Sequence, residues 1–251
     1  MTNYDVIAEE YKQSKTLPWR TYVEKFTLMH IVGFIEGQSV VDLACGEGYY
    51  TRLLQQCGVA AVSGVDISEG MIELAVAEER SRPRGIEYRV KDISELGIKS
   101  EYDLAFAAWL LNYATDVHQL ARMCKSIVRS LKPGGRFVTI NTNPDDPISN
   151  FQMGKKHGFV KRAEIPIGNS AEIREGTPII WTLSLPAGKE INITNYHLSR
   201  QTVTNTLLES GFREVNWHQP QIDPDAIQSD GKDHWQPFID TPPFAFLECF
   251  I

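Results

Sequence analysis

The sequence predicts an α/β protein with a doubly wound, mainly parallel sheet, and two observations carry that prediction. Between residues 40 and 141, short apolar runs alternate with longer segments whose apolar side chains recur every three or four positions. This alternation is typical of strand–helix–strand units, which build parallel sheets covered by helices. The length of 251 residues suits one such domain with insertions better than two domains.

The predicted strands of the core are the apolar runs that each lead into a turn, at residues 39–43, 61–66, 86–91, 103–107 and 136–141. Amphipathic spacing predicts the covering helices at 49–56, 70–80 and 117–131. The run KPGG at 132–135 ends the last of these helices, because proline cannot continue a helix and glycine tolerates a left-handed turn.

The segments around this core at 39–142 have different patterns. Residues 1–38 are expected to form a helical cap, and three β-like runs near 159–165, 178–185 and 191–198 predict a small antiparallel insertion within 143–200. A closing helix at 201–210 and strands at 214–218 and 244–250 are expected to complete a seven-stranded sheet. The connection 219–243 contains five prolines and is predicted to be a long loop, functional or disordered.

The composition limits the class of protein. A net charge of -7 would repel a phosphate backbone, so a nucleic-acid substrate is disfavoured. The four cysteines show no CxxC spacing and no neighbouring histidine cluster, so we expect no metal site and reduced thiols. No signal peptide and no apolar run of the ~18 residues needed to span a bilayer is evident. We therefore expect a cytoplasmic protein without a membrane anchor.

The most informative stretch is VVDLACGEG at residues 40–48, a strand that enters a glycine turn. Glycine lets a backbone bend sharply and approach a ligand closely. The second strand ends in Asp66, one strand–helix step after Asp42, and Asp92 follows the third strand after a similar step. The three carboxylates are therefore expected at one edge of the sheet, where Asp66 can accept two hydrogen bonds from a ribose.

The nature of the nucleotide follows from the residues after the loop. A dinucleotide fingerprint requires a third small residue, and Thr51 occupies that position after bulky Tyr49 and Tyr50. A carboxylate such as Asp42 is unfavourable beside phosphates but suits a ligand that carries an ammonium group. The pattern thus favours an adenosyl amino acid over NAD.

Four motifs in this order resemble the class I S-adenosylmethionine-dependent methyltransferases, particularly the small-molecule group related to the ubiquinone-biosynthesis enzymes. They are DLACGEG at 42–48, VDIS at 65–68 followed by Met71, KDI at 91–93 and LKPGG at 131–135. The first matches the family's D-L-G-C-G-x-G, with Ala44 in place of the first glycine. The resemblance covers about 40–141 and implies a Rossmann-like sheet, with S-adenosylmethionine as cofactor, S-adenosylhomocysteine as its product and no metal.

The resemblance also implies which residues surround the donor. Gly46 and its neighbours would hold the methionine moiety, Asp66 the ribose, and Asp92 the adenine edge. The full set of donor-binding residues that we expect is Tyr11, Asp42, Ala44, Cys45, Gly46, Asp66, Ile67, Met71, Asp92, Ile93 and Ala108.

Residues outside the core carry a finer resemblance. The opening Y-D-x-x-A-x-x-Y at 4–11, the closing Y-x-L-S at 196–199 and the loop that contains Trp235 resemble the branch that includes the azapteridine N-methyltransferase of toxoflavin biosynthesis. A wall of aromatic side chains would suit a flat, aromatic acceptor. Tyr4, Trp109, Tyr113 and Trp235 are the aromatic residues predicted to contact it, although core packing would account for them equally well.

Methyl transfer from a sulfonium is an in-line displacement, so the main task of the protein is alignment, which can supply ~7–11 kcal/mol of the barrier. A general base is required only for a poor nucleophile that has a proton to lose. The candidates are His157, His197 and His234, in segments expected to cover the pocket, and Tyr11. For the basic run at 155–162, a solvated strand face is preferred over an anion site.

The leading hypothesis is methyl transfer to a nitrogen or oxygen of a small molecule. The alternatives are a methyltransferase acting on RNA or protein, a nicotinamide-dependent oxidoreductase, and a non-catalytic subunit that binds the donor. The acceptor, the methylated atom, the use of a base and the oligomeric state stay open at this point.

Overall fold

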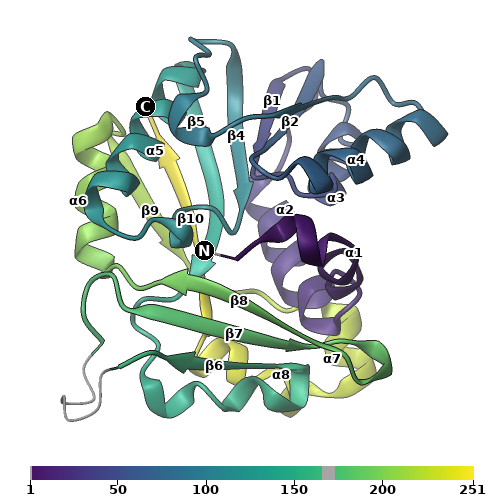
Figure 1. Cartoon of the computed structure of the whole chain (residues 1–251), viewed down its shortest axis with the longest axis vertical. Helices are drawn as coiled ribbons and strands as arrows, with labels where there is room; N and C mark the ends of the chain where they lie inside the picture. Colours follow the sequence, from purple (N-terminus) through teal and green to yellow (C-terminus); the bar gives the residue numbers. More distant parts are fainter. Residues whose placement is uncertain (1, 166–172) are drawn as a thin grey trace.

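The computed structural model describes residues 2–165 and 173–251, which form a seven-stranded and a three-stranded sheet (Figure 1). The strand order of the large sheet is β3-β2-β1-β4-β5-β10-β9. Pairs among the first five strands are parallel, whereas β10 is antiparallel to both its neighbours. The strands are β1 (Ser39–Leu43), β2 (Ala61–Asp66), β3 (Glu87–Val90), β4 (Tyr102–Ala108), β5 (Leu131–Thr142), β9 (Glu214–His218) and β10 (Phe244–Phe250).

Helices cover both faces of this sheet. The main ones are α1 (Tyr4–Ser14), the π-helix η1 (Arg20–Lys25), α2 (Phe26–Val32), α3 (Tyr49–Gln55), α4 (Glu69–Ser81), α5 (Val117–Ser130) and α6 (Arg200–Ser210). Adjacent residues of β1 separate the two layers: Val40 packs in a cluster with Leu54 of α3, and Val41 in a cluster with Ile127 of α5. This alternation confirms the predicted doubly wound fold.

The sheet reverses its order at β1. The chain runs outward from β1 to β2 and β3 and then crosses back to β4 on the other side of β1. In open α/β sheets, ligands bind at the carboxyl ends of the strands that flank such a switch point. The loops that follow β1, β2 and β4 are therefore the ones to inspect for a site.

The second sheet is the predicted antiparallel insertion. Its strands are β6 (Phe159–Ala163), β7 (Pro178–Ser184) and β8 (Glu190–Tyr196), paired in the order β6-β7-β8. They run across the lower end of the large sheet in Figure 1, and β8 lies beside α1. Part of the predicted insertion, residues 166–172, lies outside the described residues.

Two predictions outside the core are wrong. The connection 219–243 is not a plain loop, because it forms three short helices, α7 (Pro224–Asp230), α8 (Lys232–Trp235) and α9 (Pro237–Asp240). The basic run is not a solvated face at Lys161, whose side chain is 1% exposed and is paired with the buried carboxylate of Asp146. The pair provides the counter-charge that a buried ammonium requires.

The remaining short helical turns are η2 (Ile93–Glu95), η3 (Leu111–Tyr113), η4 (Ile148–Asn150), η5 (Met153–His157) and η6 (Pro186–Gly188). In residues 2–165 and 173–251, no helix has the length and apolar character needed to cross a membrane.

Candidate functional site

The turn after β1 brings the glycine loop against the end of β2. Ala44 and Gly46 both have φ of 56°, in the left-handed region that favours glycine. The Gly46 amide donates a hydrogen bond of 2.8 Å to the Asp66 carboxylate. The first and second motifs are thus joined directly, and they face a common space.

That space is a cavity of about 400 Å³ at the carboxyl edge of the sheet. Its lining combines residues from the strand ends with residues from the helical cap. The sequence-predicted residues that line it are Tyr4, Tyr11, Ala44, Gly46, Asp66, Ile67, Met71, Asp92, Ile93, Ala108, Trp109 and Tyr113. The structure therefore gathers in one place residues that lie more than 100 positions apart in the chain.

Two carboxylates mark one end of the cavity. Asp66 is 8% exposed and also accepts a hydrogen bond from the Ser68 amide at 2.9 Å. Burial raises the pKa of Asp66, and the bonds from the Ser68 and Gly46 amides oppose that rise. Asp92 is exposed and caps η2 by accepting a hydrogen bond from the Ser94 amide. Both side chains keep free lone pairs for hydroxyl or amino groups of a ligand.

Two predicted donor residues, Asp42 and Cys45, do not line the cavity. Asp42 lies beneath the loop, 1% exposed, and accepts a hydrogen bond of 2.6 Å from the Thr51 hydroxyl. Burial raises the pKa of Asp42 to about 7. Its observed contact is structural, since it joins β1 to the helix that follows the loop.

The amino-terminal residues close one side of the cavity, as expected for a helical cap, although Asp5 was not singled out from the sequence. The Asp5 carboxylate accepts hydrogen bonds from the Ser68 hydroxyl at 2.6 Å and from the Gly70 amide at 2.9 Å. At the other end of this segment, the Thr2 hydroxyl accepts a hydrogen bond from the Thr194 amide of β8 at 2.8 Å. Residues 2–5 thus form a strap between α4 and the insertion; Asp5 lies within the opening motif at 4–11, which was the available signal.

Aromatic side chains form the opposite end of the cavity. The hydroxyl groups of Tyr4 and Tyr113 are hydrogen-bonded, and the Tyr4 ring packs edge-on against Tyr11 with centroids 5.1 Å apart. Trp109 has a φ of 67°, which is strained for a bulky residue and of a kind often found at functional sites. This part of the cavity is lined by aromatic rings, of which Tyr4, Tyr11 and Tyr113 carry phenol hydroxyls.

A buried carboxylate holds Trp109 in that conformation. Glu24 is fully buried and accepts hydrogen bonds from the Trp109 indole at 2.9 Å, the Tyr50 hydroxyl at 2.8 Å and the Arg20 guanidinium at 2.9 Å. Glu24 therefore ties the cap to α3 and to the end of β4. The sequence analysis missed it, although Arg20 and Glu24 have the four-residue spacing of a helical ion pair.

Trp235, His157 and His234 do not reach the cavity. The His157 ring stacks on Trp235 with centroids 5.4 Å apart and packs against His234 at 4.6 Å. The Trp235 indole donates to the Ala226 carbonyl within α7. Burial lowers the pKa of His157 to about 4, so this histidine is neutral near pH 7. These residues form a packing cluster between the insertion and the short helices.

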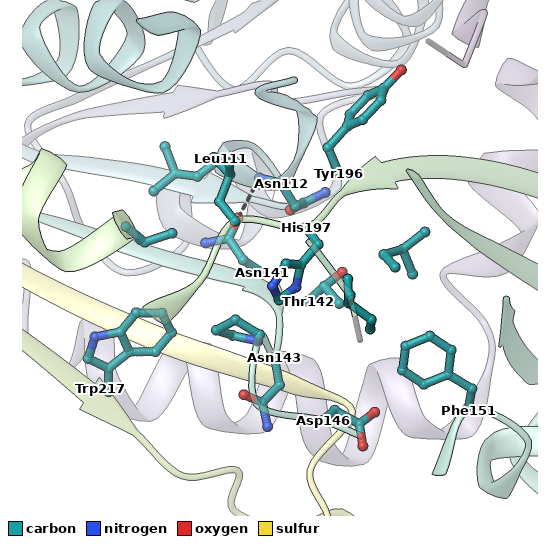
Figure 2. A pocket seen from close by; sticks show the side chains of 15 residues that line it. Leu111, Asn112, Asn141, Thr142, Asn143, Asp146, Phe151, Tyr196, His197 and Trp217 are labelled. Atoms are coloured by element: carbon teal, nitrogen blue, oxygen red, sulfur yellow. Dashed lines mark hydrogen bonds between the residues drawn. The ribbon is translucent and has the colours of Figure 1, made fainter. Parts of the chain in front are cut away.

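His197 lines a separate hollow of about 30 Å³, shown in Figure 2. Asn141 and Asn112 line the same hollow, where the backbone N–H of Asn112 donates a hydrogen bond to the side-chain oxygen of Asn141 at 3.2 Å. Burial lowers the pKa of His197. Of the four candidate bases, only Tyr11 lies in the lining of the large cavity.

Comparisons with known proteins agree with this geometry. Residues 40–135 match the family described as "Methyltransferase domain". The ubiquinone biosynthesis O-methyltransferase of Bordetella avium is 30% identical over 121 residues, which are 47% of this chain and 48% of that protein. The chain thus matches about half the length of this relative. The demethylmenaquinone methyltransferase of Symbiobacterium thermophilum is 29% identical over 231 residues, 85% of this chain and 82% of the relative.

A solved S-adenosylmethionine-dependent methyltransferase from Mesorhizobium loti has the same fold, with a TM-score of 0.64, 22% identity and coverage of 95% of this chain and all of that one. The residues present fit an adenosyl donor, because the glycine loop and two carboxylates open onto a cavity at the switch point of the sheet. Residues 40–135 are therefore similar to a methyltransferase domain, in a fold shared with a solved S-adenosylmethionine-dependent methyltransferase.

Proposed function

We propose that this protein transfers a methyl group from S-adenosylmethionine to a nitrogen or oxygen atom of a small, flat molecule. The observation that carries the proposal is the cavity of about 400 Å³, whose two ends differ in chemistry. One end presents carboxylates and loop backbone, and the other presents aromatic rings. Such a division suits a polar donor and an aromatic acceptor held end to end.

The donor would occupy the end formed by the strand termini. Asp66 would accept hydrogen bonds from the ribose hydroxyls, while Asp92 and Ile93 would contact the adenine edge. The loop at Ala44 and Gly46 would hold the methionine moiety. Asp42 and Cys45 would support that loop from below rather than touch the ligand, because the cavity does not reach them.

The acceptor would lie against Tyr4, Tyr11, Trp109 and Tyr113. When bound, the donor supplies an activated methyl group on a sulfonium, so the chain need only align a lone pair with that carbon and exclude water. No histidine lies among the described residues that line the cavity. We therefore favour an acceptor that needs no imidazole base, with the strap at residues 2–5 and the insertion acting as a lid.

Several finer points are part of the proposal. A flat heteroaromatic acceptor, of the kind used in the azapteridine N-methyltransferase branch, suits the aromatic end. The relatives named for ubiquinone and menaquinone biosynthesis support a small-molecule acceptor. The net charge of -7 argues against RNA. The free cysteines suit a cytoplasmic location.

Calorimetric titration with S-adenosylmethionine tests the donor site. We expect the parent to bind and Asp66→Ala to bind at least about tenfold more weakly, since hydrogen bonds to a carboxylate are lost. Asp116→Ala is the matched control, because Asp116 caps α5 outside the cavity. A folded parent that binds no donor, or an Asp66→Ala protein that binds like the parent, would contradict the assignment.

A further inference from the structure

Behind the aromatic end of the cavity lies a second, smaller hollow of about 20 Å³. Tyr11, Trp109 and Tyr113 line both spaces, so these three side chains form a shared wall. The hollow lies where the cap, the end of β4 and the insertion meet. Any acceptor that extends past the shared wall would place its far end there.

Three unpartnered N–H donors belong to side chains that line this hollow. The Trp19 indole nitrogen, Arg20 Nε and Asn195 Nδ2 are buried and have no hydrogen-bond partner among the described residues. Their residues are 1%, 4% and 2% exposed. Buried donors are rarely left unpaired, because each costs the free energy of its lost hydration. Three at one hollow indicate a missing hydrogen-bond acceptor.

The orientation of the Asn195 amide is fixed by its neighbours. The Trp181 indole donates to the Thr142 hydroxyl oxygen at 3.1 Å, so the Thr142 proton is free to be donated to Asn195 Oδ1 at 3.3 Å. The amide oxygen is thereby occupied, and the amide nitrogen lies near the Tyr113 hydroxyl without a well-aligned hydrogen bond. The side chains that carry these donors thus come from both the cap and β8.

We propose that this hollow receives an unprotonated oxygen of the methyl acceptor, either a ring carbonyl or the oxyanion derived from it. The volume suits about one oxygen atom with its substituent carbon, since a single water needs a cavity of ~10–15 Å³. An amino group would meet three donors with none of its own protons satisfied. Arg20 and Lys15 both contact Glu24, and together the two cations carry one more charge than this carboxylate. The surroundings can therefore tolerate an oxyanion. The inference rests on the proposed function and names the substrate class for it.

Titration of matched probes into protein saturated with S-adenosylhomocysteine tests the inference. The probes are a quinolone, which presents a ring carbonyl, and the aminoquinoline substituted at the same position. We expect the quinolone to bind about tenfold or more tightly, and this preference to fall several-fold in Trp19→Phe and in Asn195→Leu. Trp235→Phe, an equally buried tryptophan outside the hollow, should keep the preference of the parent.

Binding of S-adenosylhomocysteine is measured in every variant, and its absence in the parent would count against the proposed function itself. With that binding intact, equal affinity for the two probes, or binding of neither at millimolar concentration, would overturn the inference. A preference that persists unchanged in both variants would also overturn it, because water would then satisfy the three donors.

Discussion

The buried Glu24 carboxylate offers the sharpest test of how the cap is attached to the core. Glu24 is fully buried and Arg20 is 4% exposed, so solvent does not screen their interaction. The donors to Glu24 are Arg20, Tyr50 and Trp109, and an amide oxygen in Glu24→Gln could accept at most about two hydrogen bonds. The variant would leave the Arg20 guanidinium buried without a counter-charge.

Removing one partner of a buried ion pair costs about 3–5 kcal/mol, so we expect Glu24→Gln to lower the free energy of unfolding by that amount. Urea denaturation at pH 7 measures it. The control is Glu10→Gln, which removes a solvent-accessible pair with Lys189 and should leave the free energy of unfolding nearly unchanged.

A second variant isolates the pairing from the packing. Arg20→Met combined with Glu24→Gln removes both charges, so the double variant should be at least about 2 kcal/mol more stable than the sum of the single effects predicts. Additive costs, or a Glu24→Gln variant within about 1 kcal/mol of the parent, would refute the view that the pair is a coupled, buried unit.

Three further predictions concern the loop and the insertion. Burial raises the pKa of Asp42 from its usual value of about 4 to about 7, so the contribution of this carboxyl group to the free energy of unfolding is fully present below about pH 4 and is lost as the pH rises through 7. Asp42→Asn should therefore gain on the order of 2 kcal/mol relative to the parent between pH 5 and 8 in urea titrations, and parallel pH profiles would contradict this. Ala44→Gly should raise the free energy of unfolding by up to about 1 kcal/mol by relieving the left-handed φ of 56°; destabilisation would count against strain at this position. Lys161→Met should cost about 3–5 kcal/mol because it leaves the Asp146 carboxylate buried alone, and Asp146→Asn in the same background should recover part of the loss; no recovery would show that the two residues are not coupled.

Sequence patterns predicted several strands of the large sheet well because their signals are local. The bounds of β1, β2, β9 and β10 agree with the predicted runs, since each combines an apolar run with a turn at its end. The prediction for the connection 219–243 was wrong because its helices lack such a local signal. Helices α7, α8 and α9 are four to seven residues long, too short to show helical periodicity.

The donor end of the cavity was accessible to sequence reasoning because each of its residues follows a strand at the same edge. The residues of the proposed acceptor end were harder to predict from the sequence. Tyr4 and Tyr113 were singled out as aromatic residues, but Trp235 was chosen for the same reason and packs elsewhere. Nothing in the spacing of Arg20 and Asn195 indicates that they meet, because contacts between the cap and the insertion depend on tertiary packing alone.

The turn that follows β2 contacts both the cavity and the amino-terminal strap. Asp66 lines the cavity, and two positions later Ser68 caps α4 and donates a hydrogen bond to Asp5 of the strap. A shift of this turn is therefore transmitted to the first residues of the chain. If the proposed donor site is correct, a ligand held by Asp66 would also influence the position of the strap at residues 2–5, because one short turn connects the two.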